Sequence, residues 1–336
     1  MRILVTGGAG YVGSVSVEAF LEAGHDVTVL DDLSTGHRGA VPPGATLEVG
    51  SYGDAAGVEA LLARDRIDAV LHCGAKSLVG ESMADPAKYF RGNVSGGIAL
   101  LDGMRAAGVR RIVFSSTAAT YGMPERTPIL ESDPVRPINA YGETKRCVEA
   151  AIGWYGHGYG LRSVILRYFN VAGASRANGE QHEPETHLIP NILLTAEAGR
   201  EMTLYGDDYA TPDGTCVRDY IHVEDLASAH LAAVLATDPA DLRTGAASGP
   251  CQPLICNLGN STGFSNREIV TAAESVVGHS IAVKIGPRRA GDPPTLVASS
   301  DRARSELGWR PRHDSIEEMI GSAWAWRRAH PAGYAD

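Results

Sequence analysis

The most constraining feature of this chain is a glycine-rich turn close to its N-terminus. An apolar run at Arg2–Val5 is followed by the residues TGGAGYVG (6–13), and a helical pattern then continues to Leu21. Glycines at such a junction allow a tight turn and let a pyrophosphate approach the N–H groups that open the helix. The motif therefore predicts a parallel α/β sheet that binds a dinucleotide.

An acidic residue at the end of the next predicted strand indicates which dinucleotide binds. Asp31 follows the strand expected at Asp26–Leu30, about 20 residues beyond the glycines, where a ribose-binding acid is expected. A carboxylate there accepts hydrogen bonds from ribose hydroxyls and repels a 2′-phosphate, which favours NAD over NADP. Asp32 is either part of this site or a solvated turn residue.

The first half of the chain alternates between strand and helix patterns. Further strands are expected at Ala69–His72, Arg111–Ser115 and Leu161–Arg167, with a helix at Gly96–Ala107. Such alternation predicts an α/β protein with a Rossmann-type doubly wound parallel sheet. We expect an NAD-binding domain over residues 1–170. Residues 171–336 should form mainly a smaller C-terminal substrate-binding lobe, with some segments returning to pack on the first domain.

Charge and cysteine content exclude several classes of protein. The 336 residues carry a formal charge of −10, which disfavours a nucleic-acid partner. The five cysteines show no zinc-knuckle or CxxC spacing, so no metal is predicted and reduced thiols in the cytoplasm are expected. No signal peptide or apolar run of membrane-spanning length is found, so no membrane partner is expected.

A second motif carries the chemistry. Tyr141 and Lys145 are four residues apart on a predicted helix, so they share a face. An ammonium beside a phenol favours the phenolate, and we expect Lys145 to lower the pKa of Tyr141 so that it can take a proton near neutral pH. Ser115, Ser116 and Thr117 end a predicted strand, which is where ligands bind in doubly wound sheets.

These motifs together resemble the extended short-chain dehydrogenase/reductase family, and within it the UDP-galactose/UDP-glucose 4-epimerases. Three further stretches are similar to those enzymes: RYFNV (167–171), VRDYIHV (217–223) and RRAGD (288–292). The resemblance covers nearly the whole chain. It implies an isomerase that inverts C4 of a UDP-hexose through an NAD-dependent 4-keto intermediate, with a UDP-sugar as its small-molecule partner.

The resemblance also implies roles for individual residues. The catalytic residues would be Thr117, Tyr141 and Lys145. The cofactor site would comprise Gly7, Gly10, Tyr11, Val12, Gly13, Asp31, Asp32, Ser34, Ser51, Tyr52, Cys73, Ala75, Asn93, Ser115, Tyr141, Lys145 and Phe169. The substrate site would comprise Thr117, Tyr141, Asn170, His187, Leu188, Tyr205, Arg218, Arg289 and Asp292. An alternative for Arg218 is a salt bridge to Asp219 or Asp225.

Some positions depart from the family pattern. Val15, Ser51 and Cys73 stand where the family often has His, Asp and Phe, which puts the tightness of NAD binding in doubt. Leu296 aligns with the residue that gates N-acetylated sugars, and its modest size predicts some tolerance of UDP-N-acetyl sugars. Family members dimerise through two helices, so a homodimer using residues 96–107 and 144–154 is expected.

Other functions remain as alternatives. Other epimerases, acting on UDP-N-acetylglucosamine, pentose or uronic acid nucleotides, fit the same motifs. A 4,6-dehydratase would need an Asp-Glu pair after the catalytic threonine, whereas Ala118 and Ala119 follow Thr117. A non-catalytic NAD sensor typically lacks the Tyr or the Lys, and both are present.

Overall fold

A seven-stranded parallel sheet forms the centre of the molecule. The computed structural model describes residues 1–241, 251–288 and 292–335. The strand order is β11-β6-β5-β4-β1-β2-β3, and every neighbouring pair is parallel. The strands are β1 (Arg2–Thr6), β2 (Asp26–Asp31), β3 (Thr46–Val49), β4 (Ala69–His72), β5 (Arg111–Thr117), β6 (Arg162–Tyr168) and β11 (Leu254–Leu258).

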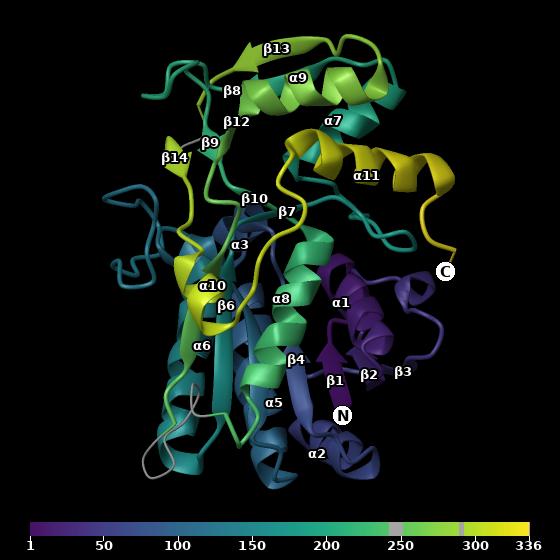
Figure 1. Cartoon of the computed structure of the whole chain (residues 1–336), viewed down its shortest axis with the longest axis vertical. Helices are drawn as coiled ribbons and strands as arrows, with labels where there is room; N and C mark the ends of the chain where they lie inside the picture. The colour runs from purple at the N-terminus through teal and green to yellow at the C-terminus, as the bar shows by residue number, and fades with distance from the viewer. Residues whose placement is uncertain (242–250, 289–291, 336) are drawn as a thin grey trace.

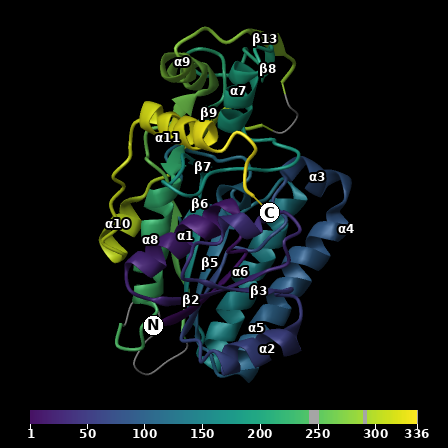
Figure 2. The ribbon, with the colours of Figure 1, turned by 90° about the vertical axis from the view of Figure 1, so that its right-hand side faces the viewer.

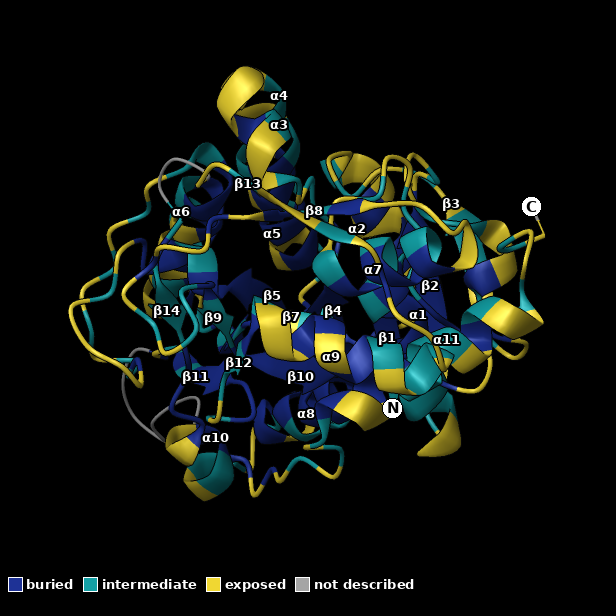
Figure 3. Ribbon diagram, turned by 90° about the horizontal axis from the view of Figure 1, so that it is seen from above, coloured by how far each residue is buried: buried dark blue, intermediate teal, exposed yellow. Residues whose placement is uncertain are grey.

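Helices cover both faces of this sheet (Figures 1 and 2). Alternate residues of each strand point to opposite faces, so Ile3 and Val5 belong to one apolar core and Leu4 to the other. The first core packs under α1 (Tyr11–Glu22) and α8 (Val223–Ala236). The second packs under α2 (Ala55–Arg64), α5 (Gly96–Ala106) and α6 (Ala140–Tyr159). Figure 3 shows the central strands as buried, between helices whose outer faces are exposed.

Local sequence signals explain where the two helices nearest the site begin. The Asn139 side chain caps α6 by accepting a hydrogen bond from Gly142 N at 2.8 Å. Helix α1 instead begins at Gly10, which has no capping side chain, and its first turn carries no acidic residue. The first N–H groups of α1 are therefore left for another acceptor.

The segment before α5 is irregular. It contains α3 (Val79–Ala84) and α4 (Pro86–Tyr89), followed by a π-helical stretch at Phe90–Ser95 that runs directly into α5. Such wide turns are frequent at functional sites. This one carries Asn93, so the predicted helix at Gly96–Ala107 is confirmed while its N-terminal extension was not foreseen.

A smaller lobe lies beyond the carboxyl ends of the central strands (Figure 1). Its core packs α7 (Leu188–Glu197), α9 (Asn266–Val277) and α11 (Ile316–Ala329) around residues such as Ile192, Ile269 and Met319. Its strand pairs are β7 (Asn170–Ala172) with β10 (Tyr220–His222), and β8 (Met202–Tyr205) with β13 (Val283–Gly286). A third group joins β9 (Val217–Arg218), β12 (Phe264–Ser265) and β14 (Thr295–Leu296), and α10 (Asp301–Glu306) packs beside β11.

The predicted fold class is confirmed: the sheet is parallel, doubly wound and accompanied by a smaller C-terminal lobe. The predicted strand at Arg111–Ser115 continues for two more residues, to Thr117, and the one predicted at Leu161–Arg167 lies one residue later. Within the described ranges, none of the helices combines the length and apolarity needed to cross a bilayer.

Candidate active site

A cavity of about 1520 Å³ opens between the carboxyl ends of the sheet and the smaller lobe. Predicted site residues from both halves of the chain line it together. Those on the cofactor side are Gly7, Gly10, Tyr11, Val12, Gly13, Asp31, Asp32, Ser34, Ser51, Tyr52, Cys73, Ala75, Tyr141, Lys145 and Phe169. Those on the substrate side are Thr117, Tyr141, Asn170, His187, Leu188, Tyr205, Arg218 and Asp292.

The glycine motif forms a turn that tolerates no larger residue at two positions. Gly7 has φ +71°, and a Cβ there would lie 2.6 Å from Gly74 Cα. A Cβ on Gly13 would lie 2.1 Å from the carbonyl oxygen of Gly7. The uncapped start of α1 faces this cavity through Gly10, so its N–H groups are available to a diphosphate. These residues fit a dinucleotide.

Asp31 is placed to receive a ribose at the end of β2. Its carboxylate accepts hydrogen bonds from Ala9 N at 3.0 Å and Leu33 N at 2.9 Å. Burial raises the pKa of Asp31, although these two hydrogen bonds act against the rise. Lys76, which the sequence analysis did not include, lines the cavity nearby, and its ammonium donates to Ser34 Oγ at 2.8 Å.

Two predicted cofactor residues, Asn93 and Ser115, are buried behind the cavity wall. The Asn93 side chain bonds both main-chain groups of Lys76, at 2.8 and 2.9 Å, and donates to Thr144 Oγ1 at 3.0 Å. Ser115 Oγ lies 3.2 Å from Cys73 Sγ and 3.0 Å from His230 Nε2. The side chains of Asn93 and Ser115 therefore hold the wall of the cavity in place.

The three predicted catalytic residues meet where β5 ends against the first turns of α6. Tyr141, Thr117 and Lys145 are each at least nine-tenths buried, and the Thr117 side chain acts to lower the pKa of the Tyr141 phenol. The Lys145 ammonium donates to Ser115 O at 2.8 Å and lies 6.0 Å from the centre of the Tyr141 ring.

The expectation that Lys145 lowers the pKa of Tyr141 is wrong for the chain by itself. Burial raises the pKa of Tyr141 to about 12, and only the hydrogen bond to Thr117 acts in the other direction. Burial also lowers the pKa of Lys145 to about 8. The ammonium is directed to a carbonyl oxygen rather than to the phenol, so desolvation dominates both groups.

Tyr168, at the end of β6, is a second phenol in this wall that sequence reasoning missed. It lines the cavity, and burial raises its pKa well above the usual value, with the charges of Cys73 and Tyr141 adding to the rise. A hydrogen bond to Ser115 opposes this shift. The available signal was its position: Tyr168 follows the predicted strand Leu161–Arg167 and directly precedes Phe169 in the RYFNV stretch.

The substrate side contains a partly buried arginine. Arg218 Nη1 donates to the carbonyl oxygens of Val217 and Pro293, and Arg218 Nη2 lies 3.9 Å from Asp292 Oδ1. The alternative salt bridge to Asp219 does not form, because that carboxylate accepts hydrogen bonds from the N–H groups of Asn260, Ser261 and Ala298.

Asp225 does not pair with Arg218 either, because its carboxylate accepts hydrogen bonds from Arg312 N and His313 N. The predicted residue Arg289 lies outside the described residues.

Four side chains on the loop between β7 and α7 form a cluster that the sequence analysis missed. Glu180, His182, Glu185 and His187 gather within this loop, and all of them line the cavity. Burial by itself lowers the pKa of both histidines, but the carboxylates raise that of His182 to about 9 and that of His187 to about 10. The spacing E-x-H-x-x-E-x-H was the signal that could have indicated it.

Comparison with known proteins identifies the family of this chain. The family model described as the NAD dependent epimerase/dehydratase family matches residues 3–243. A UDP-glucose 4-epimerase of Lacticaseibacillus casei is 49% identical over 339 residues, covering 100% of this chain and 99% of that protein.

Solved structures agree with this assignment. A crystal structure of a UDP-glucose 4-epimerase superposes with a TM-score of 0.93 at 45% identity, covering 100% of both chains. The Bifidobacterium longum UDP-glucose 4-epimerase, in complex with NAD+ and UDP, has a TM-score of 0.90 at 34% identity and covers 99% of this chain and 100% of its own. Sequence, fold and cavity together show that the chain belongs to the NAD dependent epimerase/dehydratase family.

Proposed function

We propose that the protein is an NAD-dependent isomerase that inverts C4 of a UDP-hexose, interconverting UDP-galactose and UDP-glucose. The observation that carries this proposal is the meeting of Tyr141, Thr117 and Lys145 in one cavity, between a dinucleotide-binding turn and a wall that carries Arg218. Relatives that match it over the full length include UDP-glucose 4-epimerases, which supports the same reaction.

The cofactor would lie along the carboxyl ends of β1, β2 and β4. The N–H groups at the start of α1 would receive its diphosphate, Asp31 its adenosine ribose, and Lys145 its nicotinamide ribose. NAD bound there would supply the hydride acceptor for C4′ and, once reduced, the hydride donor for the return step. Tyr52, Cys73 and Phe169 add to the wall of this part of the cavity.

Tyr141 would take the proton of the sugar 4′-hydroxyl and later give it back. Because burial raises the pKa of Tyr141 to about 12, its phenolate needs a positive charge close by. The Lys145 ammonium, one helical turn further on, is a cation that can provide it. The Thr117 hydroxyl, which lines the same cavity as the phenol, would hold the same sugar oxygen.

The substrate would be held mainly by its nucleotide. Arg218, with Asn170, Leu188 and Tyr205 in the same wall, would bind the UDP group, and a guanidinium makes strong charge-assisted hydrogen bonds to phosphate. Inversion at C4′ requires the 4-keto sugar to rotate within the site. The site would therefore hold UDP firmly and the hexose loosely.

Related reactions are weaker candidates. Epimerisation of UDP-N-acetylglucosamine, pentose or uronic acid nucleotides would use the same trio and differ only in the sugar pocket. A 4,6-dehydratase is disfavoured, because Ala118 and Ala119 follow Thr117 and cannot act as an acid/base pair.

The chain organisation proposed with this function places the cofactor half at residues 1–170. The rest would form mainly the substrate lobe, apart from returning segments such as β11, which pairs with β6 in the central sheet.

We also propose a cytoplasmic homodimer that packs through α5 and α6. Ile98 on α5 and Trp154 on α6 are 39% and 72% exposed, so each helix offers a large apolar side chain to a partner. Light scattering on the purified protein would measure its mass.

The deciding experiment incubates tag-free protein with UDP-galactose and NAD and follows UDP-glucose by chromatography. Parallel samples contain UDP-N-acetylgalactosamine or a UDP-pentose, and a further one tests for a 4-keto-6-deoxy sugar. UDP-glucose as the main product supports the proposal. Folded, NAD-loaded protein that forms no UDP-glucose, or that forms the deoxy sugar, would refute it.

A further inference from the structure

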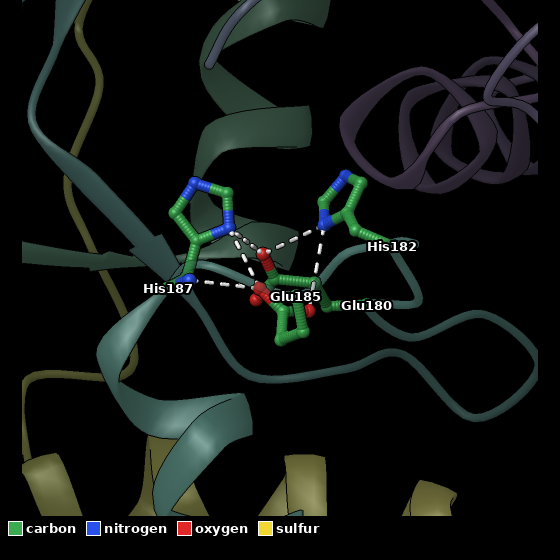
Figure 4. A group of neighbouring side chains, drawn as sticks. All are labelled: Glu180, His182, Glu185 and His187. Carbon is green, nitrogen blue, oxygen red and sulfur yellow. Dashed lines mark hydrogen bonds and ion pairs between the residues drawn. The ribbon is translucent and has the colours of Figure 1, made fainter. Parts of the chain in front are cut away.

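We propose that Glu180, His182, Glu185 and His187 form a binding site for one divalent transition-metal ion, with Zn²⁺ as the best match. Each residue offers one ligand atom, and the four atoms all lie within 4.8 Å of one another. Figure 4 shows both imidazoles and both carboxylates directed to a common centre. This departs from the sequence analysis, which predicted no metal.

The spacing of the ligand atoms matches a tetrahedral ion. Bonds of about 2.0–2.1 Å to nitrogen and oxygen place neighbouring tetrahedral ligands about 3.3 Å apart. His182 Nδ1 lies 3.3 Å from Glu180 Oε1 and 3.6 Å from Glu185 Oε2. His187 Nδ1 lies 2.8 Å from Glu180 Oε1 and 3.2 Å from Glu185 Oε1. Since all four ligand atoms lie within 4.8 Å of one another, the widest pairs would have to close by up to about 1.5 Å around an ion.

One ligand atom lies close to two carboxylates but makes no hydrogen bond. His182 Nδ1 is shielded from solvent, and among the described residues it has no partner in hydrogen-bonding geometry. Its two carboxylate neighbours are close but poorly aligned with the ring nitrogen. A buried polar atom without a hydrogen bond is costly, and a metal bond from its lone pair would satisfy it.

The supporting contacts are those of a prepared site. The side chains of Glu180 and Glu185 are only 8% and 7% exposed. The main-chain N–H groups of Thr186 and His187 donate to Glu185 Oε1 at 2.7 and 2.8 Å, which fixes the orientation of that carboxylate. Outer hydrogen bonds of this kind orient metal ligands. Two nitrogen and two oxygen ligands suit Zn²⁺ or Co²⁺ better than Ca²⁺ or Mg²⁺, which prefer oxygen alone.

A second His/Glu group in the described part of the chain is less suitable and serves as a comparison. His222, Glu224 and His313 also bring ligand atoms within 4.8 Å of one another. Both ring nitrogens of His222 are already engaged, Nδ1 with Glu224 N at 3.1 Å and Nε2 with Ser322 Oγ at 3.0 Å. That group offers fewer ligands and no unsatisfied nitrogen.

The ion would hold the loop between β7 and α7 against the cofactor side of the cavity. Tyr11, in the glycine motif, donates to Gly173 O at 2.6 Å at the start of this loop. His187 stands at the N-cap position of α7, directly before Leu188, although its side chain makes no capping hydrogen bond. Its second ring nitrogen points away from the carboxylates (Figure 4). If the proposed function holds, loss of the metal should raise the KM for the UDP-sugar more than it lowers kcat.

The test uses full-length, tag-free protein that has been stripped with a chelator and dialysed. Zn²⁺ alone is added, free metal is removed by gel filtration, and bound metal is measured by mass spectrometry. We expect about one Zn²⁺ per chain. Co²⁺ in its place should give the visible absorption bands of a tetrahedral nitrogen and oxygen site.

Variants separate this site from adventitious binding. His182→Gln and, independently, Glu180→Gln should each weaken Zn²⁺ binding by at least about 100-fold, because loss of a direct ligand exceeds the usual effect of an outer contact. His313→Gln is the matched control and should bind as the wild type does. No stoichiometric Zn²⁺ in the wild type, or binding unchanged in both ligand variants, would overturn the proposal. This readout does not depend on epimerase activity, and circular dichroism checks that each variant is folded.

Discussion

The ammonium of Lys145 donates a hydrogen bond to the main-chain oxygen of Ser115 at 2.8 Å, which ties α6 to the end of β5. Tyr141 lies one turn earlier on α6, and Thr117 lies two residues later on β5. The tie therefore holds the first turns of α6 against the strand end that carries Thr117, whose side chain acts to lower the pKa of the Tyr141 phenol. In the chain alone Lys145 acts as a positioning group, and its charge is available to the phenol only at a distance.

Replacing Tyr141 with phenylalanine should abolish most of the proposed turnover. It removes the proton-transfer group and leaves the apolar ring, so kcat should fall by about 10²- to 10⁴-fold while NAD binding is kept. Steady-state assays with UDP-galactose measure this. Tyr159→Phe, at the exposed end of the same helix, is the control and should behave as the wild type. Full activity in Tyr141→Phe would contradict the proposed chemistry.

Thr117 can be tested with a pair of nearly isosteric changes. Thr117→Val removes the hydroxyl proposed to hold the sugar 4′-oxygen, and a lost hydrogen bond of about 1.5 kcal/mol to that oxygen corresponds to roughly a tenfold fall in kcat. Thr117→Ser keeps the hydroxyl and should recover most of the rate. Equal rates for the two variants would show that the hydroxyl plays no part.

Asp31 and Asp32 can be separated by parallel substitutions. Asp31→Asn removes the buried charge that would bind the ribose, and we expect the affinity for NAD to fall by roughly 10- to 100-fold. The ratio of the affinities for NAD and NADP should also become smaller. The Asp32 carboxylate caps Ser34 N at 2.9 Å in the following turn, so Asp32→Asn should have a smaller effect. Fluorescence titration with both cofactors measures the affinities. If Asp32→Asn lowered the affinity for NAD more than Asp31→Asn, the ribose would bind Asp32 instead.

Buried neutral histidines should make the protein acid-sensitive. Burial lowers the pKa of His230 to about 3, whereas the unfolded chain binds a proton near 6.5. Unfolding therefore takes up protons below pH 6.5, and stability falls as the pH falls. Between pH 7 and pH 5 the contribution of His230 to the free energy of unfolding should drop by about 2 kcal/mol.

Denaturant unfolding of His230→Gln tests this dependence. The loss of stability between pH 7 and pH 5 should be smaller than in the wild type by about 2 kcal/mol. His72 and His222 remain, and burial lowers their pKa values to about 3 and about 4, so some acid sensitivity persists. His157→Gln, at an exposed position on α6, should leave the slope unchanged. An unaltered slope in His230→Gln would count against a neutral buried imidazole.

Leu296 should control which sugars fit. It lines the cavity from β14, next to the strand that carries Arg218. Leu296→Tyr should reduce turnover of UDP-N-acetylgalactosamine by about tenfold or more relative to UDP-galactose, because the larger ring fills space near the N-acetyl group. Leu296→Met conserves volume and should keep the wild-type ratio. A ratio that does not change in the tyrosine variant would place the gate elsewhere.

Much of the site could be predicted because its signals are local. The turn of Gly7 and Gly13, the acid at Asp31 and the four-residue spacing of Tyr141 and Lys145 each depend on neighbours in the sequence. The fold class, the family and the NAD cofactor were predicted correctly from them. The π-helical turn that carries Asn93 could not be predicted, because its widened hydrogen-bond pattern has no comparable sequence signal.

The pKa values of Tyr141 and Lys145 could not be predicted from the sequence. Spacing places Lys145 on the same face as Tyr141, but only the fold directs its ammonium to Ser115 O and surrounds both groups with buried strand ends. Desolvation then outweighs the attraction between them, since burial penalises each charged form.

The sequence by itself determined the alternation of strands and helices in the first half of the chain, the cofactor turn and the catalytic spacing, because these follow from periodicity and from residues a few positions apart. The tertiary structure alone decided which distant side chains share a wall: Arg218 with Leu188, Ser115 with His230, and the convergence of Glu180, His182, Glu185 and His187. Such meetings depend on how the chain folds back over the strand ends, and burial there sets the charges that the side chains carry.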